Sequence, residues 1–269
     1  MFFGCGAVHA AVLTGAQSGL WQVAIVWGVA VMVAVYTVGG LSGAHINPAI
    51  TAALAVWRGF PLRDAVAYVL SQVVGAFVAA VFLYALFAPH LAARERELSL
   101  VRGQPGSELT AMCYGEYFPN PGAWEAEWKK TGSYSADERV PIGAALLAEV
   151  LGTLILALVV FAVTDPDNPG RPASGTAPVF IGLTVAILIS VIAPLTQACF
   201  NPARDFGPRL FTFFAGWGPI AIPGRGPGLP FLTVYILAPT LGAVLGGGLC
   251  ARLLYPPQRD LAPDKPATT

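Results

Sequence analysis

The sequence predicts an all-α membrane protein with six transmembrane helices and two re-entrant half-helices, arranged as two inverted repeats with the first helix truncated at its N-terminus. Three observations predict this fold class: a charge-poor composition, a series of long uncharged runs, and one motif that occurs twice. Of the 269 residues, 55% are apolar and 11% are charged, whereas a soluble protein carries roughly 25% charge. The first charged side chain is that of Arg58, and a soluble domain could not cover its surface with the 57 uncharged residues that precede it.

The composition also excludes several functional classes. The 15 basic and 15 acidic residues cancel, so the chain lacks the positive footprint of a nucleic-acid-binding protein, and we expect no nucleic acid partner. Three of the four cysteines lie in apolar runs and only Cys113 lies in a polar stretch, so no disulfide framework is expected. No CxxC pair or His/Cys cluster has the spacing of metal ligands, and we expect neither a metal nor a cofactor.

The uncharged runs predict the helices in chain order. A spanning helix needs about 20 apolar residues, because a rise of about 1.5 Å per residue must cross roughly 30 Å of hydrocarbon. Five runs are long enough, and only one of them holds a charge, Glu149: 21–41, 65–93, 140–164, 172–203 and 226–251. The apolar start, Met1–Leu13, would reach only about 20 Å at this rise and is too short to span alone.

Polar connections divide what we expect to be a single membrane domain. Its parts are repeat one (1–93), an outer loop (94–139), repeat two (140–255) and a Pro-rich tail (256–269) that is expected to be disordered. If the long spans alternate and the outer loop faces outward, six basic residues share the inner side: Arg58, Arg63, Arg171, Arg252, Arg259 and Lys265. This positive-inside pattern predicts a multi-pass protein of the cytoplasmic membrane with both termini in the cytoplasm.

The repeated motif is Asn-Pro-Ala, which interrupts apolar sequence at Asn47-Pro48-Ala49 and at Asn201-Pro202-Ala203. Asn is a favoured N-cap and Pro fits the first helical position, so each triplet indicates a helix start at membrane depth. The two motifs are 154 residues apart, and the same offset places Gly28 on Gly182. An odd number of spans in each half makes the repeats inverted, and we expect the two half-helices to meet near the membrane midplane.

The same offset bears on the short N-terminal run. The partner of Glu149 would fall before Met1, so the first span lacks roughly its first turns. Our hypothesis is an upstream true start or a truncated product.

These residues resemble the major intrinsic protein family, the aquaporins and aquaglyceroporins. Ser42-Gly43-Ala44-His45-Ile46-Asn47-Pro48-Ala49 and the stretch from Asn201 to Arg209, NPARDFGPR, look like its two signature loops. Tyr117-Phe118-Pro119-Asn120-Pro121 and the stretch from Phe211 to Gly218 are similar to bacterial glycerol uptake facilitators. The resemblance implies six spans, two half-helices, one pore in each subunit and a homotetramer.

The two asparagines are the first candidate pore residues. An Asn cap uses its carbonyl oxygen on backbone N–H groups, which leaves its NH₂ group free to donate to a passing hydroxyl. The half-helix N-termini add positive potential that repels cations and protons. The alternative is simple capping without contact to the pore.

Arg204 is the second candidate, because a charge in lipid costs about 2.5–3.5 kcal/mol on insertion scales and must face a cavity or a partner. By resemblance it is the arginine of the outer constriction. The alternative is a structural pair with Asp205. By their spacing from the asparagines, the resemblance also assigns Trp27, Ile189 and Ala198 to the constriction. Glycerol facilitators have Gly and Phe where this chain has Ile189 and Ala198.

This constriction set is closer to a plant branch of the family that also passes glycerol along with water and other small neutral solutes. Trp27 would supply an apolar face for a carbon backbone, and Ala198 would leave room beside it. Interfacial anchoring is the alternative role for Trp27, and helix packing is the alternative for Ile189.

Three further residues are expected to support the site. By resemblance, the carboxylate of Glu149 accepts backbone N–H groups of the neighbouring half-helix loop; proton transfer would need a titratable partner, and none is near in sequence. His45 is expected to order hydrogen bonds in its loop, and Asp205 to cap or position the second half-helix.

The function that follows is a passive channel for glycerol and other small uncharged solutes, with some water, in a lipid bilayer. A water-selective pore is the first alternative, although it would narrow the constriction with a histidine, which these positions lack. A gradient-coupled transporter also uses inverted repeats, but it usually needs intramembrane carboxylates or cation ligands. An enzyme is not expected, since no nucleophile–base constellation, phosphate loop or metal cluster is present.

Overall fold

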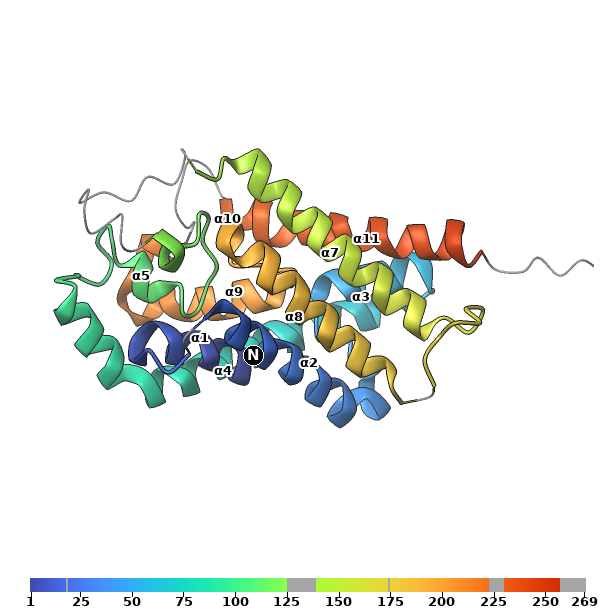
Figure 1. Cartoon of the computed structure of the whole chain (residues 1–269), viewed down its shortest axis with the longest axis horizontal. Helices are drawn as coiled ribbons and strands as arrows, with labels where there is room; N and C mark the ends of the chain where they lie inside the picture. The colour runs from blue at the N-terminus through green and yellow to red at the C-terminus, as the bar shows by residue number, and fades with distance from the viewer. Residues whose placement is uncertain (18, 125–138, 174, 223–229, 257–269) are drawn as a thin grey trace, which may run out of the picture.

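The computed structural model describes residues 1–17, 19–124, 139–173, 175–222 and 230–256, and within these ranges all regular structure is helical. Figure 1 shows an elongated bundle with α5 (Glu108–Ala111) at one end and the connection between α7 (Ile142–Thr164) and α8 (Ala177–Thr196) at the other. Of the tail that was expected to be disordered, residues 257–269 lie outside the described ranges.

Five helices are long and apolar enough to cross a membrane, which confirms the five spans predicted from the sequence. They are α2 (Leu20–Ser42), α4 (Leu62–Glu97), α7 (Ile142–Thr164), α8 (Ala177–Thr196) and the helix Pro230–Leu254, which combines α10 (Pro230–Leu232), η4 (Thr233–Leu237), α11 (Ala238–Leu249) and η5 (Cys250–Leu254). The shorter elements are α1 (Phe2–Thr14), α3 (Pro48–Trp57), α5 (Glu108–Ala111), η1 (Pro121–Trp124), α9 (Pro202–Thr212), η2 (Phe213–Trp217) and η3 (Gly218–Ile220).

Two helices end at other residues than the uncharged runs predict. The apolar run 172–203 is not one helix: α8 ends at Thr196, and the next residue, Gln197, takes a left-handed conformation. Helix α4 continues to Glu97, four residues into the predicted outer loop. Alternating charges explain this extension, because Arg94 forms an ion pair with Glu97 one turn further along the helix.

Glycines let the central helices approach one another closely. Gly28 of α2 and Gly182 of α8, which the repeat aligns, face each other, and a Cβ on Gly28 would lie 2.5 Å from the carbonyl oxygen of Gly182. Gly242 and Gly246 of α11 bring that helix against the backbone of α7 at Val150 and Leu154. The GxxxG pair of the last span is therefore a packing face, as expected for small residues in membrane helices.

The predicted outer loop is polar in composition, but part of it is not exposed to solvent. Residues 106–119 are buried. Arg102 fastens the segment with two hydrogen bonds to Glu95, of 3.0 and 2.9 Å, and Trp217 donates from Nε1 to the Thr110 hydroxyl at 3.1 Å. Several polar side chains of this segment are paired in this way, and the segment folds onto one end of the bundle.

Candidate functional site

The two half-helices begin at the two predicted asparagine caps. The side-chain oxygen of Asn47 accepts from the backbone N–H of Ala49 at 2.9 Å, with Pro48 in the first helical turn. The side-chain oxygen of Asn201 accepts from Ala203 at 3.1 Å and from Arg204 at 3.3 Å, with Pro202 in the first turn. Both carboxamides are thereby held with their NH₂ groups directed away from their own helices.

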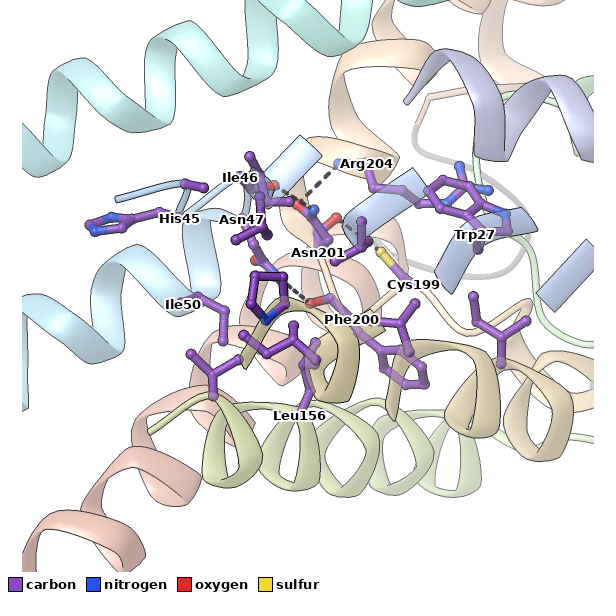
Figure 2. A pocket seen from close by; sticks show the side chains of 18 of the residues that line it. Trp27, His45, Ile46, Asn47, Ile50, Leu156, Cys199, Phe200, Asn201 and Arg204 are labelled. Atoms are coloured by element: carbon purple, nitrogen blue, oxygen red, sulfur yellow. Dashed lines mark hydrogen bonds between the residues drawn. The ribbon is translucent and has the colours of Figure 1, made fainter. Parts of the chain in front are cut away.

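The caps also bind each other's loops. Asn47 Nδ2 donates to the carbonyl oxygen of Phe200 at 2.8 Å, and Asn201 Nδ2 donates to that of Ile46 at 2.9 Å. Figure 2 shows these bonds where the two segments meet. A carboxamide has two N–H donors, so each asparagine retains one. The sequence predicted that the whole NH₂ group of each asparagine would be available to a solute, whereas the structure leaves one N–H of each available.

The loops before the caps repeat the same backbone path. Positive φ angles occur at residues 154 positions apart, in the pairs Gly43 and Gln197, Ala44 and Ala198, and Ile46 and Phe200. Non-glycine residues adopt this conformation only when their surroundings compel it. The offset that relates the motifs therefore also relates the unwound chain ahead of them.

Two cavities lie beside the re-entrant segments and meet at one group of side chains. The inner cavity has a volume of about 230 Å³ and contains both asparagines, and the outer cavity has a volume of about 490 Å³. Four residues line both cavities, which places them at the divide: Trp27, Ile189, Gln197 and Arg204. Three of these four were assigned to the constriction from the sequence, and the fourth assigned residue, Ala198, lines the inner cavity next to Gln197.

The inner cavity has an apolar and a polar side. Aliphatic side chains from α2, α7 and α8 line much of it, among them Val31, Val35, Leu156, Val160, Ile181 and Val185. Most of the polar groups come from the two re-entrant segments, with the asparagines at their meeting point. A passing molecule therefore meets hydrogen-bonding groups on one side and hydrocarbon on the other.

Arg204 is held rigidly at the divide. It is 4% exposed, its Nη1 donates to the carbonyl oxygen of Tyr114 at 2.7 Å, and its Nε forms an ion pair with Glu116. Its guanidinium carbon lies 4.7 Å from the centre of the Trp27 ring, within cation–π range. Figure 2 shows the two side chains next to each other at one end of the site.

Trp27 is positioned by close packing. Its ring lies against Gly4 of α1, where a Cβ would overlap the indole, and it also packs against the apolar cluster that contains Ile189 and Ala198. The predicted constriction residues are therefore neighbours in space. Their places in the fold do not by themselves assign a role, so their role stays a prediction.

Asp205 pairs with Arg209 and not with Arg204. Its carboxylate accepts from Arg209 Nε at 2.8 Å and Nη2 at 2.7 Å, and its Oδ1 also accepts from the backbone N–H of Glu116 at 2.8 Å. Residues four apart share a helix face and adjacent residues do not, which excludes the alternative pairing of Arg204 with its neighbour. Arg209 also donates to the carbonyl oxygens of Glu116 and Ala221. Helix α9 thus holds the outer loop in place.

Glu149 is fully buried on α7 and faces the second re-entrant loop. Its carboxylate accepts from the Thr196 hydroxyl at 2.6 Å and from the backbone N–H groups of Cys199 at 3.0 Å and Phe200 at 2.9 Å. Thr196 is the last residue of α8, and the N–H groups of Cys199 and Phe200 belong to the unwound chain after it. The carboxylate is placed to support the loop.

His45 lies at the other end of the site from Trp27 (Figure 2). Its Nδ1 is 3.3 Å from the Thr51 hydroxyl, and its ring packs against Phe60 and Tyr68 with centroids 4.6 and 4.9 Å apart. These contacts are within or beside the first re-entrant segment. They place His45 among loop-ordering contacts at the inner cavity.

The sequence interpretation missed two residues at the divide. Gln197 accepts from the backbone N–H of Tyr117 at 2.8 Å and donates to the carbonyl of Met112 at 3.2 Å. Glu116 forms the ion pair with Arg204, and burial raises the pKa of its carboxyl to about 8 while Arg204 acts to lower it. Gln197 could have been found as the residue that the repeat aligns with Gly43, whereas nothing local separates Glu116 from the other acids of its loop.

Comparison with known proteins is consistent with this arrangement. Residues 1–250 match the model of the family described as major intrinsic protein. The glycerol uptake facilitator protein of Pseudomonas aeruginosa is 42% identical over 248 residues, which cover 92% of this chain and 82% of that protein. The propanediol uptake facilitator of Citrobacter freundii is 39% identical, and the glycerol uptake facilitator of Escherichia coli strain K12 is 36% identical, each covering 94% of this chain and 87% and 83% of the relative.

A solved structure shows the same fold. The X-ray structure of the aquaglyceroporin from Plasmodium falciparum superposes with a TM-score of 0.75 at 23% identity, covering 95% of this chain and 91% of that one. The apolar helices and the two capped half-helices describe a multi-pass membrane protein. The chain belongs to the major intrinsic protein family.

Proposed function

We propose that the protein is a passive channel for glycerol and other small uncharged solutes, with some water. The observation that carries this proposal is the divide between the cavities, where the Arg204 guanidinium and the Trp27 ring lie next to each other. A polyol has hydroxyl groups along one edge and C–H groups along the other. Arg204 donors suit the hydroxyl edge, and the indole with Ile189 suits the carbon edge.

Beyond the divide, the two asparagines supply the next donors. Each retains one N–H after the reciprocal bonds to Ile46 and Phe200, so a hydroxyl leaving Arg204 meets hydrogen-bonding groups again at the centre of the inner cavity. The half-helix N-termini add positive potential there, which opposes passage of cations and protons.

A water-selective pore is less well supported. Among the described residues that line the two cavities, the imidazole is that of His45, in the inner cavity and away from the divide. Ala198 occupies little volume at a position where a larger side chain would narrow the passage. The relatives named for glycerol and propanediol uptake also favour a solute with a carbon backbone.

A gradient-coupled transporter is also less well supported. Coupling through Glu149 would require its carboxylate to exchange a proton or bind a cation. Three donors at 2.6 to 3.0 Å already occupy that carboxylate, and two of them are backbone N–H groups of the loop that it supports.

We further propose the cytoplasmic membrane as the location, with both termini in the cytoplasm. Arg58 pairs with Asp165 at 3.3 Å, and Arg252 lies 5.4 Å from the Trp57 ring centre, so a basic residue that follows α3 and one near the end of the last helix lie at the same end. This is the arrangement expected of an inner face. We also propose a homotetramer, following the family resemblance, which the mass of the detergent-solubilised protein would test.

The test of function is solute flux in reconstituted liposomes, followed by stopped-flow light scattering. We expect glycerol to equilibrate faster than in empty liposomes, to the same extent with and without a proton or sodium gradient. Glycerol uptake that requires a gradient would contradict a passive channel, and acceleration of water alone would contradict the assignment of glycerol as solute.

A further inference from the structure

The three charged side chains of α9 are all buried, and each is paired. Arg209 is paired with Asp205, whose two oxygens accept from Arg209 and from the backbone N–H of Glu116. Arg204 is paired with Glu116. Because Asp205 is engaged elsewhere, the counter-ion of the arginine at the divide comes from the outer loop.

Glu116 belongs to the lining of the pathway. It lines the outer cavity together with Arg204, and its side chain is 0% exposed. Apart from the ion pair, its two carboxylate oxygens have no hydrogen-bond partner among the described residues. Arg94, another charged residue of that lining, is paired with Glu97 at 3.0 Å. Glu116 is therefore the carboxylate that balances Arg204.

The rest of the pathway carries positive potential. The N-termini of α3 and α9 meet at its centre, and each contributes roughly half a positive charge. Such a field repels cations, but it attracts small anions. An unbalanced Arg204 at the entrance would increase this attraction, so the exclusion of anions needs a negative charge near the divide.

We propose that Glu116 is a specificity-determining residue that excludes small anions by cancelling the charge of Arg204 at the entrance of the pore. The proposal rests on the proposed function, because it assigns to this residue the discrimination between neutral solutes and anions in the same channel. Without the carboxylate, Arg204 becomes an anion-binding group in front of two positive helix ends.

Acidity should affect this exclusion. Burial raises the pKa of Glu116 to about 8, so its negative charge is present above that pH and is lost as the pH falls through it. The charged or titratable groups that act on Glu116 or line its cavity are Arg204, Asp205 and Arg209 on α9, Glu149 on α7, Cys5 on α1, Arg94 on α4, Tyr235 on η4 and Cys199 in the second re-entrant loop. His9 of α1 lies edge-to-face against Tyr114 with ring centroids 4.5 Å apart, so a Glu116 variant is needed to assign an effect of pH to Glu116.

The experiment compares four proteins in liposomes loaded with a chloride-quenched dye and voltage-clamped with valinomycin and potassium. They are the wild type, Glu116→Gln, Glu116→Asp and the matched control Glu95→Gln. The control removes a carboxylate that is also paired with an arginine, Arg102 at 2.9 Å, but that does not line either cavity. Chloride entry and glycerol equilibration are measured in the same vesicles at about pH 9 and about pH 6.

At the higher pH we expect chloride entry at the level of empty vesicles for the wild type, Glu116→Asp and Glu95→Gln. Glu116→Gln should admit chloride at least about tenfold faster, because a full charge a few ångströms away changes an anion's energy by more than this factor at an effective dielectric constant of about 20. Chloride entry through the wild type and the control should rise at the lower pH, whereas that through Glu116→Gln should not change.

Chloride exclusion by Glu116→Gln that still conducts glycerol would overturn the proposal. If this variant does not fold, Glu116→Ala replaces it, and a folded Glu116→Ala channel that conducts glycerol and excludes chloride would overturn the proposal. The glycerol measurement on the wild type separates the two proposals, since absent glycerol flux contradicts the channel assignment itself and not the role of Glu116.

Discussion

The two re-entrant segments follow the same backbone path but differ in charge. The first leads into α3 (Pro48–Trp57), and the second leads into α9 (Pro202–Thr212). Both begin at an Asn cap, and each cap binds a carbonyl of the other. Helix α3 carries no charged residue, whereas α9 carries Arg204, Asp205 and Arg209.

The aligned positions make the difference specific. At the offset of 154, the α9 residues Arg204, Asp205 and Arg209 correspond to Ile50, Thr51 and Ala55. The shared features lie at the centre and hold the half-helices together. The charges of α9 bind the outer loop and border the divide between the cavities. We conclude that the duplication accounts for the shared scaffold, and we propose that Ile189, Ala198 and Arg204 of the second half contribute more to selectivity than the residues aligned with them in the first half.

The largest effect is expected from Arg209→Met, which tests the charged half. The change leaves Asp205 buried without its cation and removes donors to two carbonyl oxygens, at a cost of about 3–5 kcal/mol in the free energy of unfolding. Arg58→Met is the matched change in the first half; Arg58 is partly exposed, with an Asp165 pair at 3.3 Å, and should cost about 1 kcal/mol or less. Unfolding in mixed micelles with increasing SDS measures both, and equal losses would contradict the asymmetry.

A smaller loss is expected from Gly28→Ala, which tests the shared scaffold. The new Cβ would lie 2.5 Å from the backbone oxygen of Gly182, which cannot move aside as a side chain could. We expect a cost of about 1–3 kcal/mol from overpacking, measured in the same titration. Gly40→Ala on the same helix is the control, since nothing lies within 4 Å of its added Cβ. Equal stability of the two variants would contradict the close contact of Gly28 with Gly182.

A loss smaller than those of Arg209→Met and Gly28→Ala is expected from Thr51→Val, which tests the uncharged half-helix α3. The hydroxyl donates to the carbonyl of Asn47 at 3.0 Å and accepts from Gln72 at 3.2 Å. Valine preserves the shape and removes these bonds, at a cost of about 1 kcal/mol. A loss as large as that of Arg209→Met would mean that the first half depends on polar contacts as strongly as the second.

Local signals explain why so much of this structure could be predicted from the sequence. Membrane spans are contiguous apolar runs, and an Asn-Pro-Ala cap lies within three residues, so both can be recognised without knowledge of distant contacts. Glu149 could be interpreted for a similar reason, because a lone acid in a long apolar run requires a partner.

The missed features depend on contacts between distant segments. Glu116 meets Arg204 across 88 positions of the chain, and its surroundings in the sequence are those of an ordinary polar loop. The burial of residues 106–119 was missed for the same reason, since three of their polar groups bind Arg209, Gln197 and Trp217 of the second half. The end of α8 within an apolar run was not predicted because Gln197 in a left-handed conformation leaves no mark in composition.

The most direct test of the central claim compares Ala198→Phe with Ala44→Phe in reconstituted liposomes. The two alanines are repeat partners with φ angles of 61° and 47°, so a larger side chain meets similar backbone strain at both, and both line the inner cavity. The measured quantity is the ratio of glycerol to water permeability by stopped-flow light scattering. The account predicts a fall of at least about tenfold for Ala198→Phe, equivalent to about 1.4 kcal/mol, and less than about threefold for Ala44→Phe. Equal falls, or a larger fall for Ala44→Phe, would contradict the assignment of selectivity to the second half.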